Sequence, residues 1–158
     1  MTATQSTHST NSNKRRIVVG VDGSEPSKQA LRWAGQIAGA LDAEITAIAA
    51  WHIPIGYGIS GSAFPWDPAE DMTKALTEAV DEVFGPHRPI GIELLVGQGN
   101  SAEVLLERSR EALMLIVGSR GHGGFAGLLL GSVSSSVAEH ATCPVLVVHG
   151  DRAVAKDG

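Results

Sequence analysis

The chain has little of three features that mark other classes of protein: cysteine, long apolar runs and clustered positive charge. Cys143 is the single cysteine among 158 residues, so no internal disulfide can form, which fits a reducing compartment. No apolar run approaches the roughly 20 residues of a membrane helix. The apolar run at 17–21 follows three basic residues but ends at Asp22, which makes it too short for the core of a signal peptide. We expect a protein of the cytoplasm without a membrane segment.

Positive charge is scarce and scattered. Lys and Arg number 12 against 17 Asp and Glu, which gives a formal net charge of -5. Proteins that bind nucleic acid through its phosphates need a basic patch or stripe, and none is visible along the chain. The charge pattern therefore argues against a nucleic-acid partner.

What the chain does have is enough apolar residues, 43%, to fill the core of one domain, which we place at residues 15–150. The segments 1–14 and 151–158 carry almost nothing to bury, and we expect a disordered polar tail and a flexible C-terminal tail. Between them, short apolar runs are typical of strands, several of them buried on both faces as in a parallel sheet. These runs lie at 17–21, 44–51, 90–96, 113–117 and 145–149.

Segments with helical period separate the apolar runs. Ser24 can cap the first of them, a second surrounds Leu76, and a third begins near Asn100, whose spacing to Glu103 is that of a capping box. A fourth is predicted at 132–140. This alternation predicts a single doubly wound α/β domain, with helices on both faces of a parallel sheet.

Residues 118–134 form a glycine-rich loop that leaves one predicted strand and enters the last predicted helix. Glycine has no Cβ, so it allows positive φ and lets a ligand approach the backbone closely. The helix directs its unpaired amides and the positive end of its dipole at the same place, and Ser132 and Ser134 add hydroxyl donors. The pattern is typical of a phosphate site and predicts nucleotide binding.

Two other phosphate motifs fit this loop poorly. A Walker A loop ends in Gly-Lys-Ser/Thr, and the chain has no lysine between Lys74 and Lys156. Gly121, Gly123 and Ala126 match the spacing of the dinucleotide fingerprint, but that fingerprint belongs to the first strand-helix unit, whereas here a single strand follows. A flexible glycine lid without a ligand stays open as an alternative.

Ligands of open α/β sheets bind at the carboxyl ends of the strands. Asp22 lies at such an end, where its carboxylate can accept hydrogen bonds from a ribose hydroxyl or an adenine amine, or instead set the turn into the first helix. The second strand and the long segment at 52–68 carry aromatic residues that could cover a planar ring or pack locally, namely Trp51, Tyr57, Phe64 and Trp66.

Spaced motifs along the chain together resemble the universal stress protein family. Gly118-x2-Gly121-x9-Gly131-Ser132 is similar to the ATP-binding signature of that family, and further agreement lies at 17–24, 116–121, 130–134 and 143–148. The resemblance covers residues 15–150. It implies a five-stranded parallel sheet in the order 3-2-1-4-5.

The resemblance also implies a ligand, ATP with Mg²⁺, and the residues that hold it. A cyclic nucleotide stays open as an alternative ligand, because adenine and ribose contacts alone do not fix the number of phosphates. By this resemblance, adenine and ribose are expected near Asp22 and Ala50, ribose and phosphate at the loop turn, and phosphates at the start of the last helix. The expected binding residues are Gly20, Asp22, Ala50, Val117, Gly118, Arg120, Gly121, Gly123, Gly124, Gly131, Ser132, Val133 and Ser134.

The family usually dimerises through its last strands, so the resemblance implies a homodimer in which Val145 to Val148 pairs antiparallel with its copy. Pairing would bury an apolar edge that is otherwise unprotected.

The sequence leaves two functions open. One is an ATP-binding regulatory module of the stress response, in which bound nucleotide changes the surface offered to an unidentified protein partner. The alternative is an enzyme of related fold, a slow ATPase or a nucleotidyl transferase. Of the six histidines only His52 and His122 fall near the predicted site, and neither has the spacing to an acid that marks a catalytic pair, so we name no catalytic residue and no metal ligand of the protein.

Overall fold

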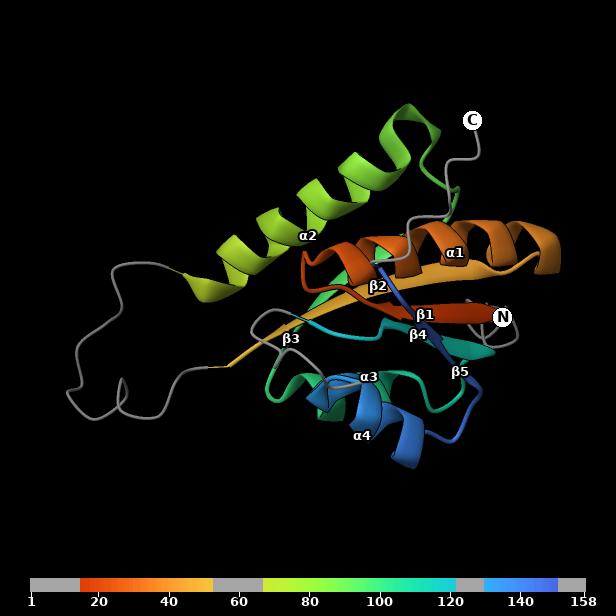
Figure 1. Cartoon of the computed structure of the whole chain (residues 1–158). Helices are drawn as coiled ribbons and strands as arrows, with labels where there is room; N and C mark the ends of the chain where they lie inside the picture. The colour runs from red at the N-terminus through yellow and green to blue at the C-terminus, as the bar shows by residue number, and fades with distance from the viewer. Residues whose placement is uncertain (1–14, 53–66, 122–129, 151–158) are drawn as a thin grey trace, which may run out of the picture.

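The structure is a computed structural model and describes residues 15–52, 67–121 and 130–150. Its middle layer is a five-stranded sheet in which every strand pairing is parallel, in the order β3-β2-β1-β4-β5 (Figure 1). The predicted class and strand order are confirmed. Both predicted tails, 1–14 and 151–158, lie outside the described residues.

Strands and helices alternate along the chain, apart from one short 3₁₀ turn, η2 (Gly85–His87). The strands are β1 (Arg16–Gly20), β2 (Glu44–Trp51), β3 (Glu93–Gln98), β4 (Met114–Gly118) and β5 (Val145–Val148). The helices are α1 (Glu25–Leu41), α2 (Pro68–Phe84), α3 (Ser101–Arg108) and α4 (Ser132–His140).

Helices cover the sheet on both sides, with α1 and α2 on one face and α3 and α4 on the other (Figure 1). Alternate residues of β1 enter different cores, because successive side chains of a strand point to opposite faces. Ile17 and Val19 pack with the residues of α1 and α2, whereas Val18 packs with Leu105 of α3 and others on the second face. Burial on both faces is what the continuous apolar runs predict.

The third strand begins three residues later than predicted, at Glu93 rather than Ile90. Gly91 has a φ of 83°, and the Ile92 amide donates to the Pro89 carbonyl, so the chain turns here before it enters the sheet. Ile90 stands at the turn with its side chain 99% exposed. Its apolar character was therefore a misleading signal of a strand.

Side chains cap the first three helices. The Ser24 hydroxyl accepts from the Ser27 amide at 3.4 Å and Asn100 Oδ1 accepts from the Glu103 amide at 3.2 Å, as predicted from their spacing. Asp67 caps α2 by accepting from two amides of its first turn. The sequence Asp67-Pro68 is itself a helix-start signal, because proline is well tolerated in the first helical turn. This helix-start signal lies at the end of the segment 52–68, where the sequence pattern alone does not predict a helix.

An ion pair joins the two helices on one face of the sheet. Lys28 Nζ of α1 lies 2.8 Å from Glu82 Oε2 of α2. The hydrogen bond to Lys28 lowers the pKa of the Glu82 carboxyl below its usual 4.5, and the bond to Glu82 raises the pKa of Lys28 above 10.5. A lowered carboxyl pKa stabilises the fold above pH 4.5, and this contribution is lost as the pH falls below that value.

We expect Glu82→Gln to lower the melting temperature slightly at neutral pH and low salt, because the Glu82 side chain is exposed and solvent screens its charge, although the Lys28 side chain is partly buried. The difference from wild type should shrink as the pH falls below 4.5 and the carboxyl becomes protonated, and it should also shrink in about 1 M salt. Thermal melts across pH measure it. Glu78→Gln on the same helix is the control and should show no such dependence. A difference that persists in acid would contradict the electrostatic origin.

Candidate functional site

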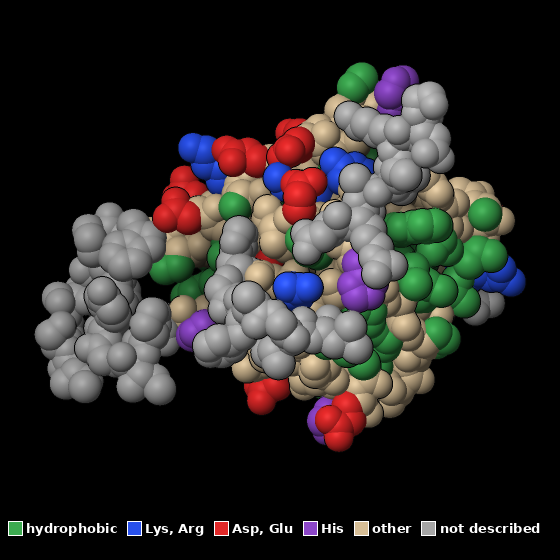
Figure 2. All heavy atoms as spheres, viewed as in Figure 1, with side chains coloured by type: hydrophobic (Ala, Val, Ile, Leu, Met, Phe, Trp, Pro, Cys, Tyr) green, Lys and Arg blue, Asp and Glu red, His purple; other side chains and the backbone are tan. Residues whose placement is uncertain are grey.

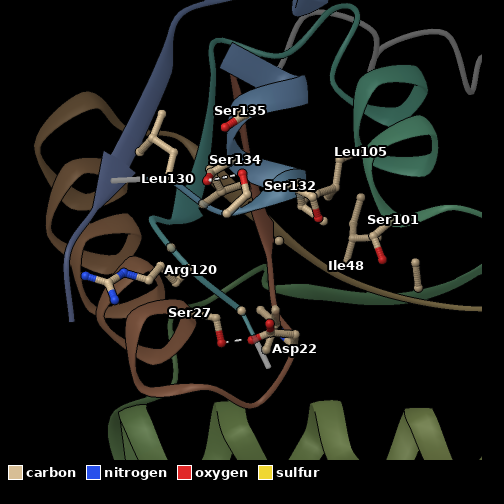
Figure 3. A pocket seen from close by; sticks show the side chains of 18 of the residues that line it. Asp22, Ser27, Ile48, Ser101, Leu105, Arg120, Leu130, Ser132, Ser134 and Ser135 are labelled. Carbon is tan, nitrogen blue, oxygen red and sulfur yellow. Dashed lines mark hydrogen bonds between the residues drawn. The ribbon is translucent and has the colours of Figure 1, made fainter. Parts of the chain in front are cut away.

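A cavity of about 740 Å³ opens at the carboxyl ends of β1 and β4 (Figure 3). Its volume falls in the range of small-molecule sites. Ile48, Leu105, Val117 and Leu130 contribute apolar wall, and the serines of α4 contribute polar groups. The position is the one expected for ligands of an open α/β sheet.

The structure brings most of the predicted site residues to this cavity. Eleven of the thirteen line it, and the other two, Gly123 and Gly124, lie outside the described residues. The eleven are Gly20, Asp22, Ala50, Val117, Gly118, Arg120, Gly121, Gly131, Ser132, Val133 and Ser134.

Other lining residues were not predicted, because they lie within strands and helices rather than in the loops that follow strands. They are Ser27, Ile48, Met72, Leu105 and Ser135, whereas three further lining residues, Val21, Ser101 and Leu130, lie in or next to the segments that follow strands. Helical period marks Met72 and Leu105 as core residues but does not say that they also reach a ligand cavity. Ser27 and Ser135 carry a weak signal, since each is a hydroxyl in the first turns of a helix that starts at this edge.

Asp22 forms one corner of the cavity and is held by its own turn. Its Oδ1 accepts from the amide of Ser24 at 2.9 Å and from the Ser24 hydroxyl. The Asp22 amide donates to Ser27 Oγ at 3.3 Å, a bond drawn in Figure 3. The carboxylate therefore sets the turn into α1 through one oxygen. Its other oxygen, Oδ2, lies on the side of Gly121.

Position 118 requires a glycine because β4 packs closely against the start of α1. A Cβ at this position would lie 2.6 Å from Pro26 Cβ, 2.7 Å from the Pro26 carbonyl carbon and 2.8 Å from the Ser27 amide nitrogen. Two of these three atoms belong to the backbone of α1. Close approach of β4 to the start of α1 therefore requires a glycine, whether or not a ligand is present.

The other two glycines of the motif leave room within the loop itself. A Cβ at Gly121 would collide with Asp22 Oδ2, so the absence of a side chain lets the loop approach this carboxylate. A Cβ at Gly131 would lie 3.3 Å from the Cα of Arg120 and 3.5 Å from the Ser119 carbonyl, which is tight but needs only small adjustments. Gly131 has a φ of -76°, so no left-handed conformation is involved.

Helix α4 is the one described α-helix that begins without a side-chain cap. Gly131 occupies the N-cap position, and the Ser135 amide donates to its carbonyl at 2.9 Å. The amides of Ser132, Val133 and Ser134 precede that first intrahelical bond, and all three residues line the cavity. The start of α4 thus offers a positive dipole end and a row of donors to an anion.

The hydroxyl of Ser134 has a partner inside the protein. It donates to the Ser119 carbonyl at 2.8 Å and lies 3.2 Å from the Gly131 carbonyl, and the residue is 2% exposed. A hydroxyl has one proton to donate, so this group holds the loop against α4. The Ser134 contribution to an anion would come from its backbone amide.

Charge is sparse around the cavity. Asp22 and Arg120 are the only charged residues among its described lining residues. Figure 3 shows the Arg120 side chain extended away from Asp22, on the side of the cavity where α1 passes. Within the described part of the chain, no group of three or more His, Cys, Asp or Glu side chains is arranged to hold a metal ion.

The end of β2 supplies the wall next to Asp22. Ala50 lines the cavity, whereas Trp51 is not among the lining residues, and its carbonyl accepts from the Gly99 amide at 2.7 Å. The other three aromatic residues considered for a planar ring, Tyr57, Phe64 and Trp66, lie outside the described residues.

Strand β5 is an outer strand of the sheet and pairs only with β4 among the described strands. Three of its four residues, Val145 to Val147, are partly buried, and only Val148 is fully so. Apolar side chains gather in Figure 2 in the region where Figure 1 shows β5. None of the helices in the described ranges is long and apolar enough to cross a bilayer.

Comparison with known proteins identifies the family of the chain. The sequence profile described as the universal stress protein family matches residues 14–149. A universal stress protein of Mycolicibacterium smegmatis is 33% identical over 150 residues, which are 89% of this chain and 50% of the relative. The chain thus spans about half the length of the curated relatives that it matches first.

Solved structures agree in fold. A universal stress protein in complex with cAMP is 33% identical, with a TM-score of 0.64 over 87% of this chain and 98% of the other. A universal stress family protein of Arabidopsis thaliana with AMP bound has a TM-score of 0.56 at 20% identity, over 87% and 93% of the two chains. Together with a profile that spans nearly the whole described chain, these matches show that the chain belongs to the universal stress protein family.

Proposed function

We propose that the protein is an adenine nucleotide-binding regulatory module of the stress response, with ATP and Mg²⁺ as its ligand. The start of α4 carries the proposal, because its uncapped amides line a cavity that holds Asp22 at its other side (Figure 3). Phosphates suit the amides and the dipole, and ribose or adenine suits the carboxylate. Ile48, Leu105 and Val117 supply the apolar surface that a base requires.

The universal stress protein solved with cAMP supports an adenine nucleotide as the ligand. It is also a reason to test cAMP beside ATP. Charge separates the two candidates. Arg120 is the only cation among the described lining residues, so it offsets the single charge of cAMP but not the charge of ATP. ATP therefore has to bring Mg²⁺, whereas cAMP needs no metal ion.

The experiment starts with the purified full chain. Any nucleotide that co-purifies is identified by mass spectrometry, and affinities for ATP, AMP and cAMP are measured by calorimetry with Mg²⁺ and with EDTA. Tight ATP binding that EDTA weakens supports the proposal. Tight cAMP binding with the same affinity in Mg²⁺ and in EDTA would instead identify the cyclic nucleotide as the ligand. Lack of affinity for all three would refute the function. Multiple turnover of ATP would favour the alternative, an ATPase or nucleotidyl transferase.

We expect Asp22→Asn to weaken nucleotide binding about ten- to a hundredfold, because a hydrogen bond to a charged group contributes about 1.5–3 kcal/mol. The amide keeps one oxygen to accept from the Ser24 amide and hydroxyl, so the turn into α1 should persist. The melting temperature of the free protein should stay within about 2 °C of wild type. Calorimetry and thermal melts measure the two effects.

Asp22→Ala is the matched comparison, because it removes both carboxylate oxygens and with them the support of Ser24. We expect it to lose binding and also to lower the melting temperature. Equal nucleotide affinity in wild type and Asp22→Asn would show that the carboxylate only stabilises the turn into α1 and does not contribute to nucleotide binding.

We also propose a homodimer through antiparallel pairing of β5 with its copy, in the cytoplasm, where the single cysteine stays reduced. The apolar outer edge of the sheet supports the dimer, since an unpaired edge of this kind invites association. Sedimentation equilibrium tests it, and a monomer at all accessible concentrations would contradict it. If β5 is covered by a second copy of the chain, the protein partner has to bind a surface other than β5.

A further inference from the structure

Ser119 lies directly behind the cavity, at the end of β4, and is not one of the residues that line it. It is 3% exposed. Its amide donates to the Val148 carbonyl at 2.7 Å, and its carbonyl accepts from the Gly131 amide at 2.6 Å and from the Ser134 hydroxyl at 2.8 Å. We call these four residues the Ser119 junction. One peptide group on each side of Ser119 thus connects the last residue of β5 to the first turn of α4.

The carbonyl oxygen of Ser119 has no spare hydrogen-bonding capacity. A carbonyl oxygen has two lone pairs, and the Ser119 carbonyl uses both, one for an amide and one for a hydroxyl. The donors come from the N-cap and the third residue of α4, so they belong to the same turn as the amides proposed to bind phosphate, and Ser134 carries one of those amides itself. A shift of the first turn of α4 would therefore strain two bonds to one buried oxygen.

A second route joins the cavity to the end of β5. Pro26 lies between two glycines, because a Cβ at Gly118 or at Gly150 would come within 2.6 Å of it. Gly150 follows β5 by two residues, and Gly118 ends β4. Ser27, next to Pro26, lines the cavity and accepts from the Asp22 amide. Both corners of the cavity, Asp22 and the start of α4, are therefore connected through contacts to the carboxyl end of β5.

We propose that the Ser119 junction couples nucleotide occupancy to the outer strand β5, and that Ser134 is the positioning residue of this coupling. The inference rests on the proposed nucleotide site. Phosphate held by the α4 amides fixes the first turn of the helix, which fixes Ser119 and hence the Val148 end of β5. The partner that senses the change is a second copy of this chain paired on β5. Coupling of this kind is reciprocal, so dimerisation must change nucleotide affinity by the same factor.

The experiment follows hydrogen exchange of the Ser119 amide by NMR, with and without saturating ATP and Mg²⁺, in the full chain. We expect ATP to slow exchange of this amide in wild type. Ser134→Ala removes one of the three hydrogen bonds of the junction, so it should reduce the slowing about five- to tenfold. Ser136→Ala, on the same helix but outside the cavity lining, should behave as wild type. The dimer dissociation constant, measured by sedimentation, should depend on ATP in wild type and less so in Ser134→Ala.

Two results would overturn the coupling: bound ATP that leaves Ser119 exchange unchanged in wild type, or a full response in Ser134→Ala. If no nucleotide binds wild type, the proposed function fails independently of the junction. The junction is then tested by comparing Ser119 amide exchange in wild type and Ser134→Ala without ligand. Faster Ser119 exchange in Ser134→Ala would then support a mechanical link to β5, and equal rates would overturn it. Should Ser134→Ala not fold, Ser134→Cys keeps the volume with a weak donor and serves in its place.

Discussion

Gly118→Ala should destabilise the protein by about 3 kcal/mol, near the upper end of the usual cost of overpacking. The added Cβ would lie within 2.8 Å of three atoms of α1, and two of them belong to the Pro26-Ser27 peptide. A rotamer change cannot move peptide atoms, so β4 and α1 have to separate. We expect a drop of about 10 °C in melting temperature, measured by calorimetry or circular dichroism on the free protein.

Gly39→Ala provides a matched control. Gly39 lies in α1, and a Cβ there would meet nothing within 4 Å. Alanine costs less backbone entropy than glycine in a helix, so this change should stabilise the protein by about 0.5–1 kcal/mol. The same substitution is thus expected to have opposite signs at two positions of one domain. A Gly118→Ala protein as stable as wild type would refute the packing account.

This result would also change which variants can test the site. Loss of nucleotide binding in Gly118→Ala would report a disturbed fold as readily as a disturbed ligand contact. Gly131→Ala is the cleaner probe, because its nearest new contacts are at 3.3 Å or more and its φ is negative. A glycine in a ligand motif is therefore not automatically there for the ligand.

The sequence predicts the fold well because the two patterns that specify it are local. Apolar runs give β1, β2, β4 and β5 within one residue at each end, and Ser24 and Asn100 begin their helices as their spacing indicates. The exception, Ile90, is apolar for no reason that its position shows, since its side chain is exposed. Pairing partners and strand order are long-range properties, and they came from the family resemblance rather than from local pattern.

The candidate site is predicted only as far as it lies in loops at strand ends. The sequence places Asp22 and Gly131 there, but it cannot show that the Ser134 hydroxyl points back to Ser119, fifteen residues earlier. Nor can it show that Gly118 faces Pro26 rather than a ligand. Both facts depend on how α1 and α4 pack on the sheet. The roles of individual residues in a motif thus need the tertiary structure, even where the motif itself is legible.

Ser132→Pro should weaken nucleotide binding about a hundredfold or more and leave stability nearly unchanged. Ser132 is the first residue of α4, where proline is well tolerated because its missing amide has no partner in the helix. Gly131, with a ψ of 175°, already has the extended conformation that a residue before proline requires. The variant loses a backbone amide and a hydroxyl, and each hydrogen bond to a phosphate contributes about 1.5–3 kcal/mol.

Two comparisons isolate the backbone contribution. Ser132→Ala removes the hydroxyl alone, so the further loss in Ser132→Pro measures the amide. Ser101→Pro makes the same change at the first position of α3, which also lines the cavity but whose N-cap Asn100 bonds to the Glu103 amide. We expect calorimetry to show at most a threefold effect of Ser101→Pro on nucleotide affinity. The opposite order, with Ser101→Pro the more damaging, would move the phosphates from α4 to α3 and overturn the orientation proposed for the nucleotide.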